Sequence, residues 1–172
     1  MEKKLADFII GFAKKYQLDW LQQDKNIVIK FLNNSKKCLI FNGHIDTVNE
    51  GNKNKWLYPP FGQNAGVIKN NKLYGLGASD MKAGLASFLT LATQLKKQKA
   101  KIDIFFSFVV QEETDGSGTQ SFVSYFKKNY FKTTMQRCQK IQYELVWVFG
   151  DDQRLTVPRD IQLHVLYLMD TS

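Results

Sequence analysis

One segment, residues 102–110, limits most strongly what this chain can fold into. It is a long, almost entirely apolar run, and helix-like patterns lie before and after it. A run of this kind is typical of a strand that is buried on both faces of a sheet. A sheet covered on both faces needs a layer of helices on each side. The run therefore predicts an α/β protein.

The rest of the chain supplies the other elements of such a fold. Short apolar runs predict strands at residues 27–32 and 38–41, joined by a tight turn at Asn33-Asn34-Ser35. Residues 67–74 favour a β-hairpin. The periodicity of apolar side chains predicts helices over residues 2–17, 82–98 and 116–129. This order predicts a three-layer αβα domain with a mixed, mostly parallel sheet.

Composition excludes several classes of protein. The net charge of the 172-residue chain is +8, but its basic residues occur in short, scattered pairs, so we expect no nucleic-acid partner. No apolar run is long enough to span a membrane, and the N-terminus does not resemble a signal peptide. Cys38 and Cys138 lie far apart and form no Cys-x-x-Cys motif. These features predict a protein of the reducing cytoplasm.

Acidic and imidazole side chains occur at three points where strands or turns end. His44 and Asp46 follow residues 38–41, Asp80 lies in a glycine-rich turn before a helix, and Glu112 and Glu113 follow the central apolar run. Ligands in α/β sheets gather outside the carboxyl ends of the strands. We therefore expect these side chains to meet at one edge of the sheet.

The residue types suit a divalent metal. One imidazole with several carboxylates is typical of catalytic zinc, or of cobalt or manganese. His44 and Asp46 are two residues apart, so on an extended segment they point the same way and Asp46 can accept the second ring N–H of His44. Glu112 and Glu113 are adjacent and would point apart on a strand. That difference favours one metal ligand and one general base.

Each of these residues also has a simpler interpretation when it is taken alone. A lone His44 after a strand is more often a buried or surface residue than a ligand. Asp80 before a helix is usually a cap, and a Glu pair is usually a solvated surface. Only the three clusters together favour a metal site.

The same segments carry a family resemblance. The first signature of the M20 metallopeptidase family is resembled by Gly43-His44-Ile45-Asp46-Thr47-Val48. Residues 73–84, Leu-Tyr-Gly-Leu-Gly-Ala-Ser-Asp-Met-Lys-Ala-Gly, resemble the second signature. Glu112-Glu113 with Gly116 and Gly118 resembles the third, and Trp56, Pro59, Pro60 and Phe61 match the usual linking loop. The resemblance covers roughly residues 1–130. It is strongest to the subgroup of succinyl-diaminopimelate desuccinylase and acetylornithine deacetylase.

This resemblance implies a function for each candidate residue. His44 would bind one metal ion, Glu113 a second, and Asp80 both, with zinc the expected metal and cobalt or manganese the alternatives. Glu112 would be the general base and Asp46 would orient His44. The reaction would be hydrolysis of the amide bond of a small N-acylated amino acid or peptide by a hydroxide held between the metals. The family also implies a cis peptide bond after Asp80.

The sequence departs from the family at several points. Leu76 stands where the second signature often has Arg, and residues 131–172 match none of the family's motifs. The family needs a further acidic ligand, a distant histidine and an inserted domain through which many members form homodimers. Glu144 and His164 are weak candidates for the two ligands. We therefore divide the chain into residues 1–130, the N-terminal part of the catalytic domain, and a divergent tail, residues 131–172, for which a frameshift or a truncation is the expected origin.

Three functional hypotheses remain open at this stage. The first is an active amidohydrolase, including a dipeptidase or aminoacylase of the same family. The second is a catalytically inactive, truncated remnant that still binds metal. The third is an unrelated basic module that binds nucleic acid, for which no aromatic stacking surface or basic helix is evident.

Overall fold

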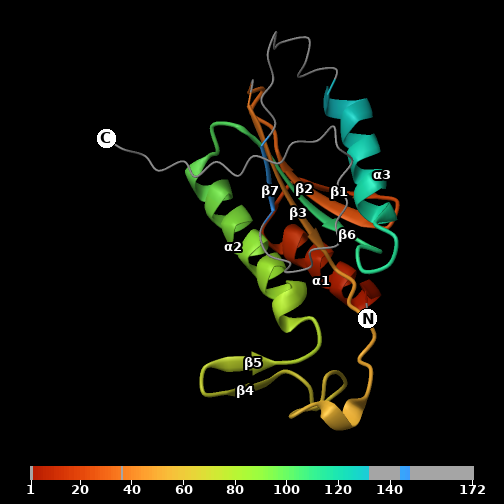
Figure 1. Ribbon diagram of the computed structural model, residues 1–172. Helices are drawn as coiled ribbons and strands as arrows, with labels where there is room; N and C mark the ends of the chain where they lie inside the picture. Colours follow the sequence, from red (N-terminus) through yellow and green to blue (C-terminus); the bar gives the residue numbers. More distant parts are fainter. Residues whose placement is uncertain (1, 36, 132–143, 148–172) are drawn as a thin grey trace.

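The computed structural model describes residues 2–35, 37–131 and 144–147. Its main sheet has five strands, in the order β1 (Trp20–Gln23), β2 (Asn26–Phe31), β6 (Asp103–Val109), β3 (Cys38–His44) and β7 (Glu144–Trp147). The helices are α1 (Glu2–Lys15), α2 (Ala83–Gln98) and α3 (Ser117–Phe126). Figure 1 shows α1 and α2 on one face of the sheet and α3 on the other. The chain is thus an α/β protein with helices on both faces.

Strand β6 is the centre of the core, as its apolar sequence predicts. All seven of its residues are buried. Side chains of a strand alternate between faces, so Phe106 and Phe108 pack with the helices α1 and α2, whereas Phe105 packs with α3. In the part of the chain that the structure describes, no helix is long and apolar enough to cross a membrane.

The order of the strands differs from the sequence prediction in two ways. Strands β2 and β3 are not neighbours joined by a tight turn, because β6 lies between them, antiparallel to β2 and parallel to β3. Strand β1 was not predicted, and it forms a hairpin with β2. Among the described strands of the main sheet two pairings are antiparallel and two are parallel. The sheet is therefore mixed, as expected, but parallel pairings do not outnumber antiparallel ones.

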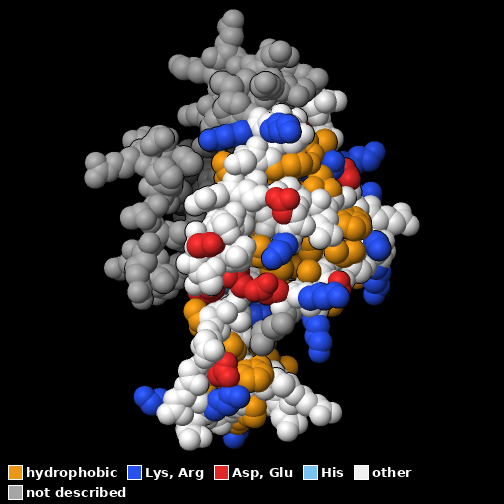
Figure 2. Space-filling view, turned by 90° about the vertical axis from the view of Figure 1, so that its right-hand side faces the viewer, with side chains coloured by type: hydrophobic (Ala, Val, Ile, Leu, Met, Phe, Trp, Pro, Cys, Tyr) orange, Lys and Arg blue, Asp and Glu red, His pale blue; other side chains and the backbone are white. Residues whose placement is uncertain are grey.

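A small lobe, residues 48–76, projects from this body. It contains a short 3₁₀ turn, η1 (Lys53–Lys55), and the expected hairpin of β4 (Val67–Lys69) and β5 (Lys72–Tyr74), turned by Asn70 and Asn71 with φ of +50° and +58°. Positive φ at both turn residues is the geometry of a tight two-residue hairpin. Figure 2 shows hydrophobic side chains on the surface of this lobe. The exposed ones are Val48, Trp56, Leu57, Phe61, Ile68 and Leu73.

Candidate metal centre

His44 is the last residue of β3, so the strand itself fixes the position of the imidazole. Its Nδ1 lies 3.1 Å from the backbone carbonyl oxygen of Asp46, and its Nε2 lies 2.9 Å from Oδ1 of Asp80. A carbonyl oxygen can only accept, which places a proton on Nδ1. In the neutral ring, Nε2 then has a free electron pair that faces Asp80. The imidazole is thus oriented as a ligand that binds metal through Nε2.

Asp46 supports this orientation from behind the ring. The nearest acceptor for Nδ1 is its backbone oxygen, whereas its carboxylate Oδ1 is 3.5 Å away. The other carboxylate oxygen, Oδ2, accepts the backbone N–H of Glu113 at 3.0 Å. Burial alone would raise the pKa of Asp46, but the nearby imidazole of His44 and hydrogen bonds from backbone N–H groups outweigh burial and lower it. Asp46 therefore joins the loop after β3 to the turn after β6.

Asp80 comes from a turn of irregular backbone, η2 (Ala78–Lys82), that leads into α2. The peptide bond between Asp80 and Met81 is cis, as the family resemblance implies. No side chain caps the first turn of α2, so Asp80 is not a helix cap. Its carboxylate instead faces His44, and its side chain is 50% exposed.

Gly43 and Met81 bring the turn η2 against β3. Met81 is buried, and its sulfur accepts the backbone N–H of His44. A Cβ atom on Gly43 would lie only 2.7 Å from Met81 and 2.8 Å from Leu85. The glycine before His44 thus allows α2 to pack close enough to bring Asp80 to the imidazole.

Glu112 and Glu113 do not lie on a strand. β6 ends at Val109, and both glutamates lie in a turn closed by the hydrogen bond from Gly116 N–H to the carbonyl oxygen of Gln111. The prediction that they point apart on extended backbone was therefore based on the wrong local structure. Oε2 of Glu112 is 3.8 Å from Nε2 of His44, and Glu113 is also close to the ring.

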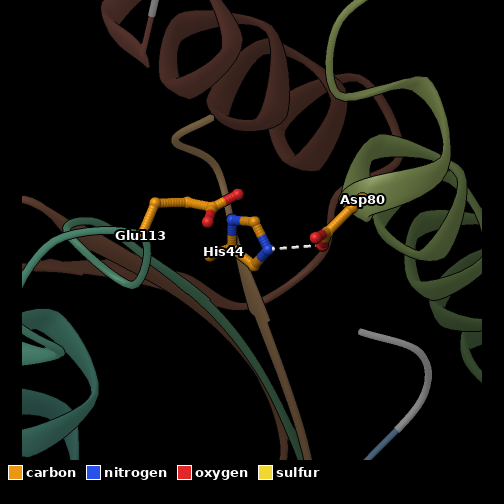
Figure 3. A group of neighbouring side chains, drawn as sticks. All are labelled: His44, Asp80 and Glu113. Carbon is orange, nitrogen blue, oxygen red and sulfur yellow. Dashed lines mark hydrogen bonds and ion pairs between the residues drawn. The ribbon is translucent and has the colours of Figure 1, made fainter. Parts of the chain in front are cut away.

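Three of the candidate residues converge as a group of metal-binding atoms. One atom each of His44, Asp80 and Glu113 lies within 4.8 Å of the others. In Figure 3 the imidazole lies between the two carboxyl groups. An imidazole with two carboxylates is a donor set that catalytic zinc uses. The described residues therefore fit a divalent ion.

The charges of the site show why a cation would be favourable. Burial raises the pKa of Glu112 and of Glu113, and the neighbouring carboxylates raise it further. Burial lowers the pKa of His44, but hydrogen bonds to Asp46 and Asp80 and the charge of Glu112 outweigh it and raise the pKa to about 9. Without metal, a protonated His44 thus partly neutralises the acidic cluster. A divalent ion would replace that proton.

The remaining candidates lie elsewhere. Glu144 begins β7, and its backbone pairs with Leu39, five residues along β3 from His44 and so about 17 Å away. This position gives no support to Glu144 as a ligand of the same site. His164 lies outside the described residues.

Leu76 and Lys82, two further residues of the second motif, lie close to the candidate site. Leu76, which stands where the family often has Arg, lines a hollow of about 440 Å³ beside Asp46, together with Val48 and Phe61. Lys82, for which the sequence predicts no role, places its ammonium nitrogen in a buried position near the charges of Asp46, Asp80 and Glu113. Its position in the second motif, two residues after Asp80, is the sequence feature that could have identified it as part of the site.

Comparison with known proteins identifies the family of this chain. Residues 40–161, more than half of the chain, match the family described as peptidase family M20/M25/M40, and the chain belongs to this family. The chain is 32% identical over 108 residues to succinyl-diaminopimelate desuccinylase of Blochmanniella floridana, covering 63% of this chain and 26% of that protein. It is 36% identical over 97 residues to the same enzyme of Coxiella burnetii (strain Dugway 5J108-111), covering 55% and 25%.

Solved structures show the same fold. The M20 family metallo-carboxypeptidase Sso-CP2 from Sulfolobus solfataricus matches with a TM-score of 0.62 at 20% identity, over 76% of this chain and 30% of that one. Human carnosine dipeptidase 1 matches with a TM-score of 0.60 at 18% identity, over 76% and 30%. The chain thus spans about a quarter of the length of the curated relatives and under a third of these structures.

Proposed function

We propose that this chain carries the N-terminal part of the metal site of an amidohydrolase that uses two divalent ions. The observation that carries the proposal is the convergence of His44, Asp80 and Glu113 within 4.8 Å. His44 would bind one ion, Glu113 the other, and Asp80 both. Zinc is the expected metal, with cobalt or manganese as alternatives. Such ions, when bound, supply an activated water and polarise the carbonyl of the substrate.

Glu112 and Asp46 would act on protons and on orientation. Glu112 lies beside the imidazole without belonging to the group of three, and this position suits a general base that acts next to the metal ions. Asp46 would hold the His44 ring in the tautomer that presents Nε2. These roles extend the family resemblance to individual residues of this chain.

The proposed reaction is hydrolysis of the amide bond of a small N-acylated amino acid, as in succinyl-diaminopimelate desuccinylase or acetylornithine deacetylase. The names of the curated relatives support this substrate class. A dipeptidase or aminoacylase of the same family is the alternative. We further propose that residues 1–130 are the N-terminal part of a zinc-peptidase-like catalytic domain and that residues 131–172 form a separate tail.

One feature favours a second candidate, a chain that binds metal without catalysis. The described residues offer three protein ligands for two ions, so each ion has two at most when Asp80 is counted for both. Catalytic zinc normally has three protein ligands. We therefore expect the purified chain to bind metal and to show little or no turnover.

The test combines metal binding with activity. The 172-residue chain and its His44→Ala variant are titrated with zinc and with cobalt, and bound metal is measured after removal of the excess. We expect the wild type to bind at least one ion and the variant to lose this binding. A wild-type chain that binds no metal contradicts the proposed site.

The activity arm uses the same two proteins. Both are incubated with zinc, cobalt or manganese and with N-succinyl-diaminopimelate, N-acetylornithine or simple dipeptides. Turnover that follows the metal and disappears in His44→Ala would overturn the expectation of an inactive chain. It would mean that further ligands come from residues outside the described ones or from a partner chain.

A further inference from the structure

Two buried side-chain atoms of the described residues make no hydrogen bond, and they are complementary. One is Nζ of Lys82 and the other is Oδ1 of Asp46. An ammonium group has three N–H donors, and a carboxylate oxygen only accepts. Buried polar groups are almost always hydrogen-bonded, directly or through ordered water. The charge of Asp46 acts on Lys82, so a buried donor and a buried acceptor of opposite charge that form no direct ion pair suggest one water that joins them.

The backbone leaves a specific place for the ammonium group of Lys82. Gly77 has φ of +73°, and a Cβ atom there would overlap both Nζ of Lys82 and the methyl group of Thr47. The missing side chain of Gly77 thus opens the space that Nζ occupies. This space lies between the turn η2 and the loop after β3, which is the loop that carries Asp46.

The surroundings of this ammonium group are acidic. Burial lowers the pKa of Lys82, and the charges of Asp46, Asp80 and Glu113 act in the opposite direction. These three carboxylates come from the loop after β3, the turn η2 and the turn after β6. The buried Nζ of Lys82 therefore lies near charges from all three segments of the candidate metal site.

We propose that Lys82 is a positioning residue whose ammonium group is joined to Oδ1 of Asp46 through one ordered water, since the two groups form no direct ion pair. The other oxygen of that carboxylate already holds the backbone of Glu113 at 3.0 Å, and Oδ1 lies 3.5 Å from Nδ1 of His44. Fixing Asp46 therefore fixes two segments that carry metal ligands. The effect on metal rests on the proposed function, but the water-mediated link between Lys82 and Asp46 does not.

Charge and position predict opposite effects when Lys82 is neutralised. Removing a positive charge beside a cation site should strengthen metal binding if charge alone matters. Loss of a group that orients metal ligands typically weakens metal binding 10–100-fold. The direction of the change therefore separates a positioning residue from a nearby charge.

The first experiment measures zinc affinity by competition with a chromophoric chelator. The proteins are the full chain, Lys82→Met, Lys82→Arg and the control Lys96→Met, which neutralises an exposed lysine of α2. We expect Lys82→Met to bind zinc at least ~10-fold more weakly, Lys82→Arg to recover part of the loss, and Lys96→Met to match the wild type. Unchanged or tighter binding in a folded Lys82→Met protein would overturn the proposal.

The second experiment needs no metal. The chain has two histidines, so ¹⁵N labelling of histidine gives few ring signals, and His44→Gln identifies those of His44. In the presence of a chelator we expect Lys82→Met to shift the Nδ1 and Nε2 signals of His44 and Lys96→Met to leave them in place. Unshifted signals in Lys82→Met reject the positioning role. If the wild type binds no zinc, the proposed function fails and this arm still decides the role of Lys82.

Folding of the variants is checked by circular dichroism and by the amide spectrum. If Lys82→Met does not fold, Lys82→Gln replaces it in both experiments, because glutamine keeps a donor while removing the charge. Lys82→Arg keeps the charge, and its ring signals for His44 should resemble those of the wild type more than those of either neutral variant. If the His44 ring signals of Lys82→Arg match those of the neutral variants, the charge of Lys82 has no role in positioning.

Discussion

His44 and Asp46 expose only 5% and 4% of their side chains, whereas Asp80, across the same site, exposes 50% and Glu112 exposes 18%. The first two belong to β3 and the residues directly after it. The others belong to turns that follow or precede regular elements. The candidate site thus has a buried floor of His44 and Asp46 and an open rim of Asp80, Glu112 and Glu113.

This difference separates two kinds of contribution. The floor side chains contact the sheet and hold one another, so changing them alters the fold as well as the site. The rim side chains are more exposed than the floor side chains, and they lie among the other charges of the cluster. We therefore expect changes at the rim to alter metal binding with little effect on stability, and changes at the floor to alter both.

The largest effect is expected within the rim. Glu113→Gln removes a proposed ligand and should weaken zinc binding by ~100-fold or more, beyond the loss typical of supporting residues. Glu112→Gln keeps the same size and should leave zinc affinity within a few-fold of the wild type. Zinc titration of both variants measures this pair. The opposite order would exchange the two proposed roles.

The rim prediction also has a stability arm. Urea denaturation of the metal-free proteins should give free energies of unfolding for Glu112→Gln and Glu113→Gln close to that of the wild type, within ~0.5 kcal/mol, as for ordinary surface changes. A large loss in either variant would place that glutamate with the floor.

A smaller effect on metal, joined to a loss of stability, is expected at the floor. Asp46→Ala removes the acceptor of the Glu113 backbone N–H and leaves a buried donor without a partner. Such a change costs about 1–3 kcal/mol of stability. It should also weaken zinc binding 10–100-fold through the loss of orientation.

Urea denaturation and zinc titration of one preparation measure both parts of the floor prediction. Asp7→Ala is the matched control, because Asp7 is an exposed acid on α1. If Asp46→Ala lowers metal affinity while leaving the free energy of unfolding unchanged, the floor does not support the fold and the comparison fails.

The same division explains how far the sequence could be interpreted. Elements with a regular period were predictable: α1, α2 and the buried β6 lie where their apolar patterns place them. The pairing of β2 with β6 and not with β3 was not predictable, because hydrophobic periodicity does not identify a strand's neighbour. The four-residue strand β1 escaped detection, since Trp20–Gln23 has two glutamines and no clear alternation.

The site shows a similar limit. The three clusters could be brought together from the rule that ligands gather at the carboxyl ends of strands. The local backbone around Glu112 could not, because the turn starts at Gln111 with a φ of +59°, a conformation that residues other than glycine seldom adopt. The atom of Asp46 that faces Nδ1 most closely was also beyond the sequence, since it is a backbone oxygen. Lys82 is important here because its ammonium nitrogen is buried. The burial of a single charged side chain has no pattern in the sequence that would predict it.

The smallest effect concerns pH and the metal-free floor. The pKa of His44 is raised to about 9 in the folded chain, against about 6.5 for an unperturbed histidine. A raised pKa means that protonated His44 favours the folded state. This contribution is fully present below about pH 6.5 and is lost as the pH rises through about 9.

We therefore expect the free energy of unfolding of the metal-free chain, minus that of His44→Gln, to fall between pH 6.5 and 9.5. Urea denaturation in the presence of a chelator measures this difference, and using the difference removes titrations common to both proteins. Zinc binds the neutral imidazole, so zinc affinity of the wild type should rise over the same range. With saturating zinc the loss of stability should disappear, because the ion replaces the proton between His44 and the acidic rim. A difference that grows with pH in the chelated protein would mean that His44 is neutral in the metal-free fold, and that burial outweighs the carboxylates around it.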